Sequence, residues 1–71
     1  MKITRRQHMD GGADWFNDRN NGFVSVDKDG RWWCEDHKGS VYGFSNLVTG
    51  STQAPAYLRK MAKRAQRDTT T

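Results

Sequence analysis

The sequence predicts an α+β fold in which a three-stranded antiparallel meander, at about residues 22–45, packs on a C-terminal amphipathic helix, at about residues 55–66. Two observations predict it. A motif with Asp first and Gly fourth occurs twice, as Asp27-Lys28-Asp29-Gly30 and, nine residues later, as Asp36-His37-Lys38-Gly39. After Pro55, apolar and basic residues recur with the period of a helix.

The N-terminal segment has no clear periodicity. Gly11-Gly12 interrupts it, and the adjacent apolar residues Trp15 and Phe16 stand before a turn-like stretch at 17–22. We expect an irregular segment with a short helical turn at about residues 13–18. We also expect flexible ends at residues 1–12 and 68–71. At this length the chain forms one small domain, residues 1–71.

The meander follows from the repeated Asp…Gly motif, which is typical of a three-residue hairpin loop that ends in a left-handed glycine. Such loops fix the register, which pairs Val26 with Trp32 and Cys34 with Tyr42. Cross-strand partners share a face, so the predicted core face consists of Val24, Val26, Trp32, Cys34, Tyr42 and Phe44. The opposite face carries Phe23, Ser25, Arg31, Trp33, Glu35, Val41 and Gly43.

The helix follows from the residues after Pro55, a residue that suits the first turn of a helix. At about 100° per residue, the apolar residues form one arc: Tyr57, Leu58, Met61, Ala62 and Ala65. The basic residues form the opposite arc: Arg59, Lys60, Lys63, Arg64 and Arg67. We expect the apolar arc to cover the core face of the sheet and the basic arc to face outward.

Trp33 raises a functional question. Neighbouring strand residues point to opposite faces, so Trp32 in the core leaves Trp33 on the far side. Three interpretations stay open. Trp15 and Phe16 fold over Trp33, or Trp33 lies in a homodimer interface. In the third, Phe23, Trp33 and Val41, flanked by Arg31 and Glu35, form an exposed patch that binds a partner.

The sequence indicates a binding protein rather than an enzyme. It contains no phosphate-binding loop, dinucleotide fingerprint or nucleophile elbow. Its acidic pairs stand at turns, where Asp is expected. Cys34 is the only cysteine, and with His37 it lacks the paired spacing of a zinc site. The predicted register also points these two side chains to opposite faces. We therefore expect no catalytic residues, no metal and no cofactor.

Charge favours an acidic partner. Twelve Lys and Arg against eight Asp and Glu give a net charge of +4 and a pI of about 9.6. The predicted helix has five cations and no acidic residue before Asp68, whereas ordinary exposed helices mix both signs. The predicted binding residues are Arg31, Trp33, Phe23, Arg59, Lys60, Lys63, Arg64, Arg67, Arg5 and Arg6.

The leading hypothesis is a small, non-catalytic nucleic-acid-binding protein that uses the basic helix face and an exposed Trp/Arg sheet face. The alternative is a small phage or mobile-element accessory protein that binds and inhibits a host protein or defence complex through the same surface. Either partner fits a monomer or a homodimer. The single cysteine favours the cytoplasm, and no stretch approaches the apolar length of a membrane span, so we expect no membrane partner.

A three-stranded sheet followed by one helix is similar in architecture to the plant AP2 domains and to the arm-binding domains of phage-type integrases. The similarity concerns the order of elements and no specific motif. It implies that the sheet enters the major groove of DNA, with Phe23, Ser25, Arg31, Trp33 and Glu35 facing the DNA.

Overall fold

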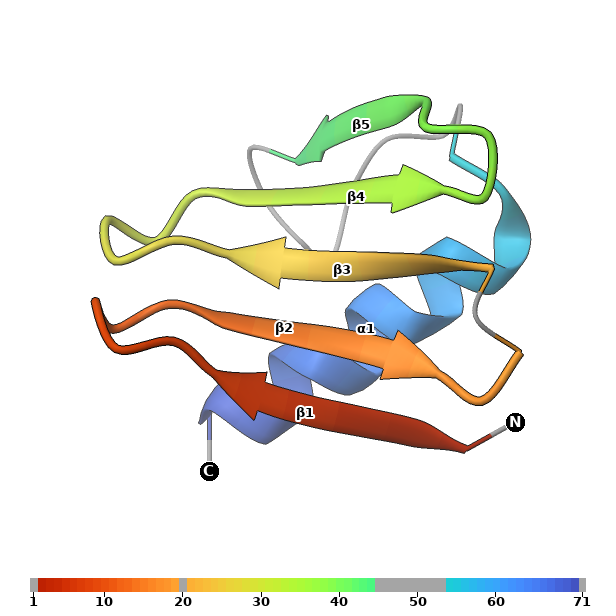
Figure 1. The fold of residues 1–71 in the computed structure, drawn as a ribbon. Coiled ribbons are helices and arrows are strands. Elements are labelled where there is room, and N and C mark those ends of the chain that lie inside the picture. The colour runs from red at the N-terminus through yellow and green to blue at the C-terminus, as the bar shows by residue number, and fades with distance from the viewer. Residues whose placement is uncertain (1, 20, 45–53, 71) are drawn as a thin grey trace.

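The computed structural model describes residues 2–19, 21–44 and 54–70. Five antiparallel strands follow one another in the sheet in chain order: β1 (Ile3–Gln7), β2 (Ala13–Asn17), β3 (Gly22–Val26), β4 (Trp32–Asp36) and β5 (Val41–Phe44). A single described helix, α1 (Ala56–Thr70), crosses one face of this sheet (Figure 1). The α+β class is therefore confirmed, whereas the predicted number of three strands is wrong.

The predicted meander corresponds to β3, β4 and β5, and its register is confirmed. Val26 pairs with Trp32, and Cys34 pairs with Tyr42. Both connecting turns end in a glycine with positive φ, 82° at Gly30 and 85° at Gly39. In each turn the first Asp accepts hydrogen bonds from two backbone N–H groups through Oδ1. Ser45, at the end of the predicted meander, lies outside the described residues.

The expectation of an irregular or short-helical N-terminal segment is wrong, because residues 3–7 and 13–17 form β1 and β2. A third turn of the same kind joins these strands: the backbone N–H of His8 donates to the carbonyl of Gly12 at 2.8 Å, and Gly11 has φ 103°. This turn begins with His8 instead of Asp, so the Asp…Gly motif does not reveal it. Residues 3–7, which we expected to be flexible, pair with β2 along their whole length.

Polar residues on both faces of β2 hide its alternation. Ala13, Trp15 and Asn17 face α1, and Asp14 and Phe16 point to the opposite side. Asp14 and Asn17 are both buried. A buried polar residue on each face removes the simple apolar and polar alternation by which a strand is recognised in a sequence.

The core lies between α1 and the sheet. Trp15, Val24 and Cys34 contribute from the strands, and Leu58, Met61, Ala62 and Ala65 contribute from the helix. The Trp15 and Trp32 rings stack with their centroids 5.4 Å apart. The predicted core face is confirmed for five of its six members. Val24 and Cys34 belong to this cluster, and three more pack against it: Val26, Trp32 and Tyr42. The side chain of Phe44 lies outside the described part of the structure.

Helix α1 is attached to the sheet at both ends. Near its start, the Tyr57 hydroxyl donates to the carbonyl of Asn21 at 2.6 Å. Near its end, the buried Trp15 indole N–H donates to Asp68 Oδ2 at 3.0 Å. The second bond is one reason why the helix continues to Thr70 rather than ending at about residue 66. Among the described residues, no helix combines the length and the apolar character that crossing a bilayer requires.

Candidate nucleic-acid interface

The sheet divides the predicted binding residues into two groups. The basic residues of α1 lie on the helix side of the molecule (Figure 1). The other side, which we call the outer face, is the sheet surface opposite α1. The register assigns to it Thr4, Arg6, Asp14, Phe16, Phe23, Ser25, Trp33, Glu35 and Val41. Phe23 and Trp33 thus lie across the sheet from the basic helix residues.

A basic groove runs between β1 and α1. Its lining residues are Ile3, Lys60, Arg64 and Arg67, and its volume is about 170 Å³. The three cations have i, i+4 and i+7 spacing, which places them on one side of a helix. Like charges around one concave site reinforce each other's potential and raise the local concentration of anions. The groove is therefore suited to a negatively charged group such as a phosphate.

Strand β1 has one arginine on each side of the sheet, Arg5 on the side of this groove and Arg6 on the outer face. Arg5 points to the helix side, with its guanidinium carbon 5.8 Å from the centre of the Trp15 ring. Arg6 points to the outer face, 5.0 Å from the centre of the Phe16 ring. Both side chains are exposed. Because neighbouring strand residues alternate, one edge strand presents a cation to each side of the sheet.

The other predicted cations are exposed but do not line this groove. Arg59 and Lys63 each neighbour a groove residue in sequence, which places them about 100° away around the helix axis. Arg31 follows the β3–β4 turn, where its backbone carbonyl accepts a hydrogen bond from Asp27. These three residues add to the general positive charge and are not part of the convergent site.

Aromatic side chains gather on the outer face. The Phe16 and Phe23 rings, from neighbouring strands, have centroids 5.9 Å apart and are tilted by 39°. Trp33 is half-buried on the same face. The interpretation in which Trp15 and Phe16 fold over Trp33 is wrong for Trp15, which is fully buried on the helix side, whereas Phe16 lies on the same face as Trp33. Phe16 was not among the predicted site residues, and recognising β2 as a strand would have placed it here. Homodimerisation through Trp33 stays a prediction.

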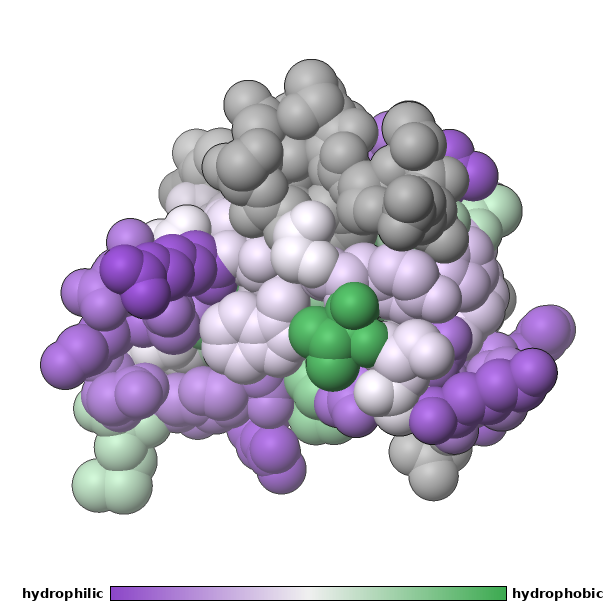
Figure 2. Space-filling view, turned by 90° about the horizontal axis from the view of Figure 1, so that it is seen from above, coloured by the Kyte–Doolittle hydropathy of each residue, from purple (hydrophilic) through white to green (hydrophobic). Residues whose placement is uncertain are grey.

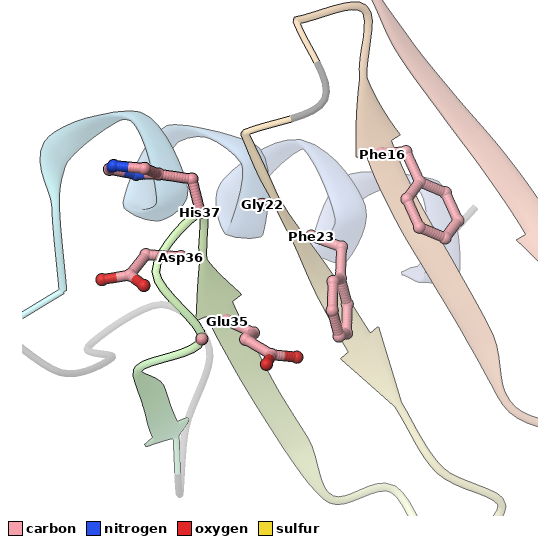
Figure 3. Close-up of a pocket in the computed structure, with 7 residues that line it drawn as sticks. Phe16, Gly22, Phe23, Glu35, Asp36 and His37 are labelled. Carbon is pink, nitrogen blue, oxygen red and sulfur yellow. The ribbon is translucent and has the colours of Figure 1, made fainter.

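A depression of about 310 Å³ lies at one end of this aromatic group (Figure 3). It is lined by Phe16, Gly22, Phe23, Glu35, Asp36, His37 and Gly39. The two phenyl rings and the Glu35 side chain stand on the same side of the sheet (Figure 3). The Asp36 carboxylate already has hydrogen-bond donors within the protein. These are the backbone N–H groups of Lys38 and Ser40 and the Tyr42 hydroxyl. No described residue is hydrogen-bonded to the Glu35 carboxylate.

Asp14 is the centre of a polar cluster on the outer face. Its Oδ1 accepts a hydrogen bond from Ser25 Oγ at 2.6 Å. Its Oδ2 lies 2.8 Å from His8 Nε2 and 3.2 Å from Arg6 Nη2. In a catalytic triad the histidine bonds the serine, whereas here the aspartate bonds both, and Ser25 is only 1% exposed. This arrangement joins β1, β2 and β3 and does not activate a nucleophile.

Acid should weaken this cluster. Burial by itself raises the pKa of Asp14, but hydrogen bonds from Ser25, His8 and Arg6 outweigh it and hold the pKa below its ordinary value. The contribution of this carboxylate to the free energy of unfolding is then fully present above about pH 4. It disappears as the pH falls through the lowered pKa. We expect urea unfolding of the wild type to show this loss at acidic pH.

Asp14→Asn is the matched variant. It should be less stable at neutral pH and should lose less stability on acidification than the wild type. Some acid dependence should remain, because the pKa of Asp36 is lowered as well. The largest cause is the hydrogen bond from the backbone N–H of Ser40 to the Asp36 carboxylate. An acid transition of unchanged steepness in the variant would contradict the assignment to Asp14.

Cys34 lies on the helix side of β4 and is fully buried. Burial raises the pKa of its thiol to about 11, with a further contribution from the negative charge of Asp36. The reactive form of a cysteine is the thiolate, which this environment disfavours at neutral pH. Cys34 therefore acts as a small apolar side chain of the core.

Comparison of this chain with protein-family models, with curated proteins and with solved structures finds no match. The architectural similarity to three-stranded DNA-binding domains also loses its basis, because β1 and β2 extend the sheet to five strands. The function must therefore be argued from the site itself.

Proposed function

We propose that this protein is a small, non-catalytic nucleic-acid-binding protein whose basic groove between β1 and α1 holds the phosphate backbone. The observation that carries the proposal is the convergence of Lys60, Arg64 and Arg67 on one groove at the edge of the sheet. Arg5 extends this positive surface along the helix side of β1, whereas Arg6 lies on the outer face and pairs with Asp14. An extended track of cations suits a polyanion better than it suits a single small anion.

Counterion release should contribute to the affinity for nucleic acid. Each phosphate that a Lys or Arg neutralises releases condensed cations from the nucleic acid, so affinity depends strongly on salt. Exposed Arg59 and Lys63 raise the positive potential around the groove without lining it. They support association by long-range attraction more than by direct contact.

The alternative is a phage or mobile-element accessory protein that binds and inhibits a host protein. Half-buried Trp33 beside exposed Val41 on the outer face supports it. Stable protein interfaces usually need a larger apolar patch. In the described part of the chain, the exposed large hydrophobic residues are Met9 and Val41. In the view from above, the strongest hydrophobic colour forms one small central group, with paler green at the lower left and upper right among hydrophilic side chains (Figure 2). We therefore favour nucleic acid. The cytoplasmic location stays a prediction.

We expect the double variant Lys60→Ala/Arg64→Ala to bind nucleic acid more weakly, with an affinity that depends less on salt. Binding of a fluorescently labelled oligonucleotide, followed by anisotropy over a series of salt concentrations, should weaken for all sequences alike. The slope of log affinity against log salt should fall by about 1.4–1.8, as expected for two lost phosphate contacts. Both side chains are exposed, so the melting temperature should change little.

The control is Lys28→Ala/Lys38→Ala, which removes the same charge from two exposed hairpin turns outside the groove. Its salt slope should stay close to that of the wild type. Lys63→Ala tests a helix residue outside the groove and should have a small effect. Equal losses in both double variants would show that net charge alone matters. A wild type that binds no oligonucleotide at low salt would exclude the proposed function.

A further inference from the structure

We infer that the bound nucleic acid is single-stranded, and that the depression at Phe16, Phe23 and Glu35 takes an unpaired base that carries an amino group, such as cytosine. This inference rests on the proposed function and adds the class of strand and of base. It is carried by the rings, the carboxylate and the position of Arg6.

The rings provide the binding surface for a base. Phe16 and Phe23 stand side by side on neighbouring strands of the outer face and line a depression of about 310 Å³. This volume is at the lower end of the range for small-molecule sites. Aromatic side chains on a sheet bind unpaired bases by stacking, which every base allows because each has a π face. Bases inside a duplex are already stacked on their neighbours and cannot enter such a depression.

The carboxylate provides selectivity. An ionised Glu accepts hydrogen bonds and cannot donate them. Cytosine presents an amino donor at N4, whereas thymine presents the O4 acceptor in the same place. Glu35 is the carboxylate suited to this contact, because the neighbouring Asp36 already accepts bonds from its own turn and from Tyr42. The negative charge also repels phosphate, so the depression favours the base end of a nucleotide.

Arg6 connects the depression to the basic edge. It lies on the edge strand β1, with its guanidinium over the Phe16 ring. On the outer face the register aligns Thr4, Phe16, Phe23 and Glu35 in one row across four strands. With neighbouring strands about 4.8 Å apart, this row spans about 14 Å. Phosphates held along β1 would thus leave their bases within reach of the rings, with Glu35 at the far end of the row.

The test compares single-stranded oligo(dC), single-stranded oligo(dT) and a duplex, all of one length, at neutral pH and low salt. The two homopolymers have the same number of phosphates, so their difference reports the bases alone. The wild type should bind oligo(dC) roughly tenfold more tightly than oligo(dT). It should bind the duplex more weakly than either single strand.

Glu35→Gln is the decisive variant, because it keeps the shape of the side chain and adds a donor that thymine can accept. It should bring the affinities for oligo(dC) and oligo(dT) together. Phe23→Ala should weaken binding of both by about 5- to 100-fold, the range for loss of one stacked base. Met9→Ala, at the exposed β1–β2 turn and outside the depression, should leave both affinities unchanged. Melting curves identify any variant that is unfolded, and Glu35→Gln decides the question if Phe23→Ala does not fold.

The outcomes separate this inference from the proposed function. Equal affinity for the three nucleic acids, still weakened by Lys60→Ala/Arg64→Ala, would overturn the inference and leave the proposed function standing. A dC preference that survives in Glu35→Gln would overturn the role of Glu35. Unchanged nucleic-acid binding in both Glu35→Gln and Phe23→Ala would show that the depression does not hold a base and would overturn the inference. Absence of any binding by the wild type would remove both proposals.

Discussion

Replacement of Trp15 by alanine is expected to reduce the free energy of unfolding by about 3–5 kcal/mol, the range for removal of a buried aromatic residue. Trp15 is fully buried, stacks on Trp32 and donates its indole N–H to Asp68. Small domains have a total stability of only about 5–15 kcal/mol. Urea unfolding followed by circular dichroism should therefore show a variant that is partly or wholly unfolded without denaturant.

Trp15→Phe is the matched control. It keeps an aromatic ring in the core and removes the N–H group that reaches Asp68. We expect a smaller loss than in Trp15→Ala, because most of the buried apolar surface remains. Asp68→Ala should cost less stability in the Trp15→Phe background than in the wild type, since the bond between the two side chains is already absent there. A Trp15→Ala protein as stable as the wild type would contradict the position of Trp15 in the core.

Gly22→Ala is expected to have the second largest effect, a loss of roughly 2–5 kcal/mol from backbone strain and overpacking together. Gly22 has φ 137°, a conformation that side chains rarely allow. A Cβ atom there would lie 2.6 Å from the carbonyl oxygen of Glu35 and 3.2 Å from Leu58 Cδ2. The first of these atoms is backbone in β4 and cannot move aside. The same unfolding measurement applies.

Gly30→Ala separates the two causes. Gly30 also has a positive φ, 82°, but a Cβ atom there would meet nothing within 4 Å. It should lose about 1–2 kcal/mol, the cost of the left-handed conformation alone. The excess loss in Gly22→Ala then reports the steric contact with β4 and α1 together with the greater strain of φ 137° compared with φ 82°. Equal losses in the two variants would contradict that contact.

Part of the candidate site could be predicted from the sequence. The helical period after Pro55 placed Lys60, Arg64 and Arg67 on the exposed side of α1. Alternation around Trp32 placed Phe23 and Trp33 on the opposite side of the sheet. The groove could not be predicted, because it also needs Ile3 from β1. Likewise, Phe16 joins Phe23 only through the pairing of β2 with β3.

The sequence by itself determined the register of β3, β4 and β5 and the apolar side of α1. The reason is that hairpin loops with Asp and Gly, and the helical period, depend on residues close together in the chain. Only the tertiary structure decided that residues 3–17 form two strands, because the buried polar groups of β2 need distant partners. Asp14 bonds Ser25, and Trp15 bonds Asp68 at the far end of the chain. Only such long-range pairing could place the basic edge strand beside the aromatic rings of the outer face and α1 on the opposite face of the sheet.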